Sequence, residues 1–161
     1  MSTATVGFES WLADLEGAFE DIAAPALGLS GMEVLHRHRT PPVAQAALLG
    51  LTGPEGSIQI GLASDEVGCQ SLARSLLGLG PDEGPLPPPE AADAFCEIVN
   101  IAAGAFKARL RDRTTQLQMG LPIYIHGAVQ ATEQVEVQVC EVRFGAARAA
   151  LLLVHPRSAE S

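Results

Sequence analysis

The sequence predicts a single α+β domain in which long helices pack on an antiparallel sheet. With 161 residues, 47% hydrophobic content and positive mean hydropathy, the chain has the size and the apolar content of one domain. A helix followed by three strands is predicted twice, with one further helix between the two units, which favours a pseudo-duplicated fold. The proline-rich segment 81–89 is interpreted as an internal connection, and 1–161 as one domain, because neither side would form a convincing domain alone.

The first unit begins with a helix that has one apolar face. Its apolar residues are spaced as on a single helical stripe: Phe8, Leu12, Leu15, Phe19 and Ile22. Pro25 followed by Gly28 predicts the end of this helix. Three strands are expected next, with a turn at residues 52–56 before the third: Met32–Arg39, Val43–Leu51 and Ser57–Leu62.

The second unit contains the longest helical pattern of the chain, Glu90 to about Arg111. A shorter helix precedes it, with Ser64 as the expected N-cap and an end near Gly78. Three strands are predicted after it: Gln116–His126, Gln134–Val142 and Ala146–His155. The last strand carries four apolar residues in succession, so we expect it either at the centre of a six-stranded sheet or paired with a second chain.

Composition excludes several classes of function. The net charge is -9, and Lys107 is the only lysine, which argues against nucleic acids and anionic membranes as partners. The three cysteines lie far apart and form no C-x-x-C pair, so neither a disulfide framework nor a cysteine zinc site is predicted: Cys69, Cys96 and Cys140. The chain shows no signal-peptide pattern and no apolar run of ~18 residues, so we expect a soluble, cytoplasmic protein.

A narrow polar stripe follows one side of the long helix. At roughly 100° per residue, six apolar residues share the face that should be buried: Phe95, Ile98, Val99, Ala102, Phe106 and Leu110. On the far side, four residues fall within an arc of about 60°: Asp93, Glu97, Asn100 and Gly104. An isolated E-x-x-N is usually just a solvated helix face. Here, however, the stripe carries an asparagine and a glycine, which are poor residues for the middle of a helix.

Residues 93–104 resemble the D/S-x-x-x-E-x-x-N-x-x-x-G signature of the CheX, CheC and FliY phosphatase family. Leu121-Pro122, with Gly127 after it, is similar to a second marker of that family, and Gly56–Leu62 leading into Ser64 resembles its strand-then-helix segment. The first helix has no second E-x-x-N, so the chain is more similar to CheX than to CheC. The resemblance implies a CheX/CheC-like fold.

The resemblance also implies an activity, namely hydrolysis of the aspartyl phosphate of a phosphorylated CheY-like response regulator. Glu97 would dock on the regulator's lysine, and Asn100 would position the attacking water. Asp93, Ile101 and Gly104 would contact the regulator around this site. The chain would need no cofactor of its own, because Mg²⁺ is expected on the phosphorylated partner. CheX-like proteins dimerise through sheet edges, so a homodimer is expected as well.

Two other interpretations remain open. The chain could be a non-catalytic CheX-like binding or dimerisation module of a two-component pathway, an alternative favoured by Ala105, where family members often carry asparagine. It could also be a structural domain that binds a small molecule. His36 and His38 share a strand face at metal-ligand spacing, but no third ligand is identifiable, so we interpret them as a solvated face. His126 and His155 are interpreted as ordinary histidines.

Overall fold

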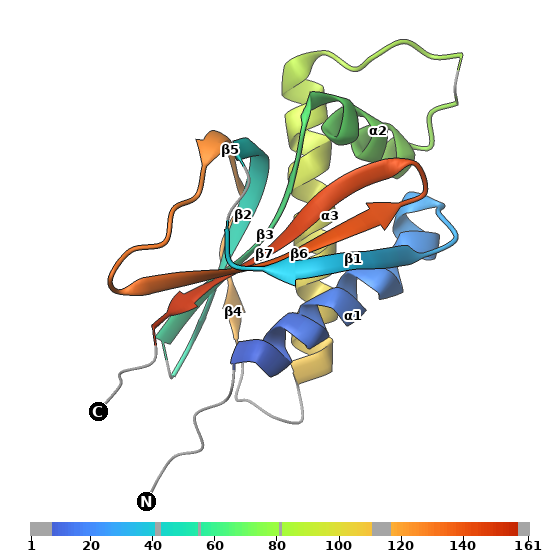
Figure 1. Ribbon diagram of the computed structural model, residues 1–161. Coiled ribbons are helices and arrows are strands. Elements are labelled where there is room, and N and C mark those ends of the chain that lie inside the picture. The colour runs from blue at the N-terminus through green and yellow to red at the C-terminus, as the bar shows by residue number, and fades with distance from the viewer. Residues whose placement is uncertain (1–7, 41–42, 55, 81, 111–116, 158–161) are drawn as a thin grey trace, which may run out of the picture.

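A computed structural model describes residues 8–40, 43–54, 56–80, 82–110 and 117–157. Within these residues, seven strands form one antiparallel sheet and there are three helices. The helices lie on one side of the sheet (Figure 1). The elements follow in the order α1 (Phe8–Leu27), β1 (Met32–His38), β2 (Val43–Gly53), β3 (Gly56–Ser64), α2 (Glu66–Leu77), α3 (Pro88–Leu110), β4 (Gln118–Met119), β5 (Ile123–Ala128), β6 (Val135–Phe144) and β7 (Ala147–Pro156). The α+β class is confirmed.

The sheet has the symmetry expected of a duplicated unit. Its strand order is β1-β6-β7-β3-β2-β4, with β5 also paired to β2. Hairpins β2–β3 and β6–β7 meet at the centre through β3 and β7, while β1 flanks the second hairpin and β5 flanks the first. The first strand of each half therefore pairs with the hairpin of the other half, and the two halves are related by a pseudo-twofold axis.

One predicted strand is interrupted. The segment expected to run from Gln116 to His126 forms two short strands, β4 and β5, which both pair with β2. Between them Gly120 donates its backbone N–H to the carbonyl of Gly50 at 2.8 Å, and Pro122 has no N–H to offer a partner strand. Gln116 itself lies outside the described residues.

Helix α1 ends directly before Gly28, as the pair of Pro25 and Gly28 predicts. Pro25 lies in the last turn, where its missing N–H removes only one helical bond, and the helix continues to Leu27. Gly28 adopts a left-handed conformation with φ +66°, and the N–H groups of Gly28 and Leu29 bond to the carbonyls of Ala24 and Ala23. A glycine in this conformation closes the helix without steric cost.

The N-cap of α2 is Asp65, and the prediction of Ser64 was wrong by one residue. Asp65 accepts the backbone N–H of Gly68 through Oδ1 at 2.7 Å. Ser64 is the last residue of β3, where its hydroxyl donates to the carbonyl of Arg148 at 2.6 Å. The Ser64 hydroxyl is therefore bonded to β7, and Asp65 caps the helix instead.

The proline-rich connection lies against α2. Gln70 donates through Nε2 to the carbonyl of Leu86 and accepts its N–H through Oε1, both at 2.9 Å. Arg74 donates to the carbonyls of Gly80 and Glu83 in the same segment. Helix α3 then begins at Pro88, two residues before the predicted Glu90, because proline fits the first turn of a helix. Its predicted end near Arg111 lies just outside the described residues, and Leu110 is the last described helical residue.

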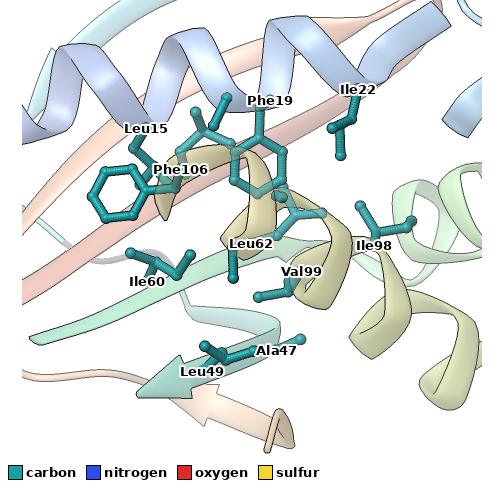
Figure 2. Close-up of a cluster of buried hydrophobic side chains, with 14 of the residues drawn as sticks. Leu15, Phe19, Ile22, Ala47, Leu49, Ile60, Leu62, Ile98, Val99 and Phe106 are labelled. Carbon is teal, nitrogen blue, oxygen red and sulfur yellow. The ribbon is translucent and has the colours of Figure 1, made fainter. Parts of the chain in front are cut away.

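The main core lies between the helices and the sheet. Figure 2 shows side chains of α1, α3, β2 and β3 meeting there: Leu15, Phe19, Ile22, Ala47, Leu49, Ile60, Leu62, Ile98, Val99 and Phe106. Strand β7 is central in the sheet, with Leu151 and Leu153 in this core and Leu152 in a second apolar cluster on the other face. The continuous apolar run of β7 is thus explained within one chain, in a sheet of seven strands instead of six.

A buried carboxylate fixes α1 to the edge strand β1. Arg37 donates from Nε and Nη2 to the two carboxylate oxygens of Glu16, each at 2.7 Å. Burial by itself raises the pKa of Glu16, but the hydrogen bonds from Arg37 and Cys140, together with the Arg37 charge, outweigh it, so the pKa of Glu16 is lowered. The pair is therefore ionised at neutral pH.

Candidate functional site

Helix α3 presents its apolar face to the protein, as the periodicity predicts. It packs against α1, α2 and β2, and its buried residues are Ala91, Ala94, Phe95, Ile98, Val99, Ala102, Ala103, Phe106 and Leu110. The charges at both ends of α3 interact favourably with its dipole, because Glu90 lies in the first turn and Lys107 and Arg109 lie in the last. A helix held on this many sides is a rigid platform for whatever its outer face carries.

The outer face carries the predicted stripe. Asp93, Glu97 and Gly104 are exposed, and Asn100 is half-buried. Within the described part of the chain, no hydrogen bond or ion pair engages the side chains of Asp93, Glu97 or Asn100. The side-chain amide of Asn100, the only asparagine of the chain, therefore makes no hydrogen bond within the described residues.

The stripe is short and shallow. At a rise of about 1.5 Å per residue, Glu97 and Asn100 are separated by about 4.5 Å along the helix axis, and their directions differ by about 60°. A Cβ atom placed on Gly104 would meet nothing within 4 Å. The surface one turn beyond Asn100 is therefore bare backbone over which another molecule can come close.

Ile101 differs from the other predicted contact residues. It is half-buried and packs against the main core, as Cys96 and Ala105 do. Only part of the Ile101 side chain is left for a partner, because its position borders the buried face. At Cys96, burial and then the charge of Asp93 raise the pKa of the thiol. The raised pKa favours the protonated thiol at Cys96.

Strand β5, which lies between the Leu121-Pro122 and Gly127 of the second predicted marker, contacts α3. Tyr124, on β5, packs edge-on against Phe95 with ring centroids 6.1 Å apart, and its hydroxyl donates to Gln45. Burial, followed by nearby Cys69, raises the pKa of Tyr124. Leu121, just before β5, is 88% exposed. Tyr124 thus supports the helix, whereas the marker residue Leu121 lies on the surface.

Arg109, near the end of α3, forms an ion pair with the neighbouring helix α1. Arg109 donates from Nε and Nη2 to the carboxylate of Asp21 on α1, at 2.9 and 3.0 Å. Arg111 and Arg113 lie outside the described residues. Arg109 is thus an ion-pair partner between two helices.

Sequence reasoning missed one cluster. His36 and His38 do share a face of β1, but a third possible ligand, Glu141 of β6, lies beside them. Glu141 is more than 100 positions away in the chain, so only the pairing of β1 with β6 brings it there. The interpretation of His126 and His155 is confirmed, because His126 is exposed and His155 is buried with bonds to Gln138 and the carbonyl of Pro156.

Among the described residues, none of the helices is both long enough and apolar enough to cross a membrane. A search of curated protein sequences gives no significant match.

Solved structures share this fold. The chain matches the chemotaxis protein CheX from Desulfovibrio desulfuricans with a TM-score of 0.75 and 15% identity, covering 92% of this chain and 99% of that one. It matches a CheX–CheY–BeF3–Mg²⁺ complex from Borrelia burgdorferi with a TM-score of 0.71 and 15% identity, over 92% and 98% of the two chains. It also matches the FliM middle domain from H. pylori with a TM-score of 0.66 and 11% identity, over 92% and 89%. At these identities the likeness establishes the fold.

The family follows from the sequence itself. The model of the chemotaxis phosphatase CheX family matches residues 45–145, well over half of the chain, and this range includes the whole stripe from Asp93 to Gly104. The chain therefore belongs to the CheX family of chemotaxis phosphatases.

Proposed function

We propose that the chain dephosphorylates the aspartyl phosphate of a CheY-type response regulator with the outer face of α3. The observation that carries this proposal is the exposed Glu97, the half-buried Asn100 and the bare turn at Gly104, which share one face of a rigid helix and have no partners among the described residues. The family match supports it, as does the similar CheX solved together with CheY, BeF3 and Mg²⁺.

In the proposed mechanism Asn100 positions the water. Its amide can accept a hydrogen bond from the water and donate one to it or to the phosphoryl group, so it can align the oxygen with the scissile P–O bond. The regulator supplies most of the charge stabilisation through its own Mg²⁺ and lysine, so this chain needs no cofactor. The attack is direct, and no covalent intermediate forms on this chain.

Glu97 is proposed to dock the helix. Its carboxylate would pair with the lysine beside the phosphoaspartate, which fixes how deeply α3 enters the site. Asp93 and the exposed part of Ile101 would contact the rim, and the missing side chain of Gly104 would let the regulator approach the helix backbone.

The test is phosphate release from a panel of receiver domains loaded with acetyl phosphate. Asn100→Ala should reduce turnover by about a hundredfold or more while binding of the phosphorylated regulator survives. Glu97→Gln should weaken both binding and turnover, and added salt should reproduce part of that loss in the unchanged protein. Ser71→Ala and Glu66→Gln, at exposed positions on α2, are the matched controls. Full activity of Asn100→Ala would refute the mechanism.

A second candidate is a non-catalytic binding module of the same pathway. Ala105, at the position that resembles an asparagine site of the family, favours it. The same assay separates the two, because a binding module would hold the phosphorylated receiver without releasing phosphate.

We also propose a cytoplasmic homodimer joined through sheet edges. The central position of β7 removes one reason for a dimer, but β1 pairs on one side only, with β6, among the described strands. Backbone groups on its other side are free to pair with a second chain. Sedimentation at micromolar concentration should show a dimer, and a monomer there would refute this part.

A further inference from the structure

The cluster of His36, His38 and Glu141 lies on the face of the sheet that the helices leave uncovered. On β1, Met32 and Val34 pack into the main core on the helix side. On β6, Cys140 and Val142 do the same, so the alternate residue Glu141 points to the opposite side. The cluster is therefore separated from the α3 stripe by the thickness of the sheet and the helix layer.

A bulge in β1 turns the two imidazoles to this side. Val34 pairs with Val142, but His36 pairs with Glu141, so Leu35 is an extra residue in the ladder. Without the extra residue, His36 would keep the same orientation as Val34 and point toward the helices. With it, Arg37 points to the helices, where it binds Glu16, and His36 and His38 point away.

The distances within the cluster approach those of a metal site. Nε2 of His36 lies 3.4 Å and Nε2 of His38 lies 2.8 Å from the same oxygen, Oε2 of Glu141. All three possible ligand atoms are within 4.8 Å of one another. A tetrahedral ion with bonds of about 2.0–2.2 Å separates its ligand atoms by about 3.4 Å. The His36 to Glu141 distance already has this value, and the other two pairs need small movements of partly exposed side chains.

The cluster is also accessible. The exposed fractions of the side chains are 61% for His36, 26% for His38 and 39% for Glu141. Three protein ligands with solvent at the fourth position match the two-histidine, one-carboxylate set that Zn²⁺ accepts. This ligand set is unlike the all-oxygen shell that Mg²⁺ and Ca²⁺ prefer.

We propose that His36, His38 and Glu141 form a surface site for a divalent transition metal of the Zn²⁺ class. Nε2 of each histidine and Oε2 of Glu141 bind the ion, and a water completes the tetrahedron. In the metal-free chain the backbone N–H of Thr40 donates to Nδ1 of His38, so the ring proton is on Nε2 and faces Glu141. Metal binding at Nε2 moves this proton to Nδ1, which breaks the bond from Thr40, and Oε2 of Glu141 exchanges the hydrogen bond from Nε2–H for a bond to the ion.

The experiment measures Zn²⁺ binding to the full chain by competition with a chromogenic chelator at neutral pH. The unchanged protein should bind one equivalent, and its melting temperature should rise with Zn²⁺. His36→Ala, His38→Ala and Glu141→Gln should each weaken binding by about tenfold or more, because each removes one of three ligands. His126→Ala, which changes an exposed histidine on β5, should bind like the unchanged protein.

Three results would overturn the site. The first is that the unchanged protein shows no binding of Zn²⁺ up to the highest soluble concentration, and the second is that binding persists in the His36→Ala/His38→Ala double variant. The third is that His126→Ala loses as much Zn²⁺ affinity as the variants of the cluster. Persistent binding in the double variant would place the ion elsewhere, for example at the half-buried Cys96. Circular dichroism should show that each variant is folded. Phosphate release does not enter the test, so this proposal and the proposed function fail separately.

Discussion

Truncating Phe106 tests the packing that holds α3 in place. The ring is fully buried and contacts Trp11 of α1 edge-on, with centroids 6.3 Å apart and planes 71° apart. Phe106→Ala removes this ring and leaves a cavity between α1, α3 and the sheet, which should cost about 3–5 kcal/mol in the free energy of unfolding. For a chain of this length that corresponds to a melting temperature lower by roughly 6–20 °C.

A two-step series separates the ring contact from the volume. Phe106→Leu keeps most of the apolar volume but loses the edge-on contact with Trp11, so we expect a smaller loss of about 1–2 kcal/mol. The assay is urea unfolding followed by far-UV circular dichroism and by the fluorescence of Trp11, the only tryptophan. Leu121→Ala, at a site 88% exposed, is the control and should change stability by less than about 0.5 kcal/mol. A loss below about 1 kcal/mol for Phe106→Ala would refute the described burial of the ring.

Three further changes test separate features. Glu16→Gln should destabilise the protein at neutral pH, because the lowered pKa of Glu16 means that its pair with Arg37 stabilises the fold while the carboxyl is ionised. The difference in stability between the two proteins should shrink as the pH falls below about 4.5, and thermal unfolding from pH 3 to 7 measures it. Asp65→Ala should cost about 0.5–2 kcal/mol in urea unfolding, since it removes the N-cap of α2, and an unchanged midpoint would assign the cap elsewhere. Gly104→Ala should raise stability by about 1 kcal/mol, because the site is open and alanine favours the helix, yet phosphate release should fall; a rise in both would show that no partner approaches this turn.

The sequence was most informative where structure is local. The stripe on α3 depends only on helical periodicity, and the burial of Phe95 and Ile98 beneath the exposed Glu97 follows it. The same holds for the end of α2 at Gly78, whose left-handed conformation a glycine favours.

Features that depend on distant partners could not be predicted. The cap moved from Ser64 to Asp65 because the Ser64 hydroxyl is used by Arg148 on β7, which is far away in the sequence. Glu141 became a neighbour of His36 only through the pairing of β1 with β6 and the bulge at Leu35. Strand pairing between distant segments leaves no periodic signal in the chain, so both assignments needed the structure.

The duplicated halves of the fold differ in what they leave uncovered. Gly17 lies 15 residues before the start of β1 (32 minus 17), and Gly104 lies 14 residues before the start of β4 (118 minus 104), so the two glycines occupy comparable turns of α1 and α3. A Cβ on Gly17 would strike the Arg109 guanidinium at 2.4 Å, whereas a Cβ on Gly104 would meet nothing.

Arg109 of α3 thus covers the turn at Gly17 of α1, which corresponds to the bare turn at Gly104. Four residues before each glycine stand Ala13 and Asn100, so the filled turn also lacks the amide. Internal symmetry would permit two such turns per chain, and Arg109, which reaches across to Asp21, covers one of them. The proposed function therefore predicts one regulator for each chain, and two for the proposed dimer.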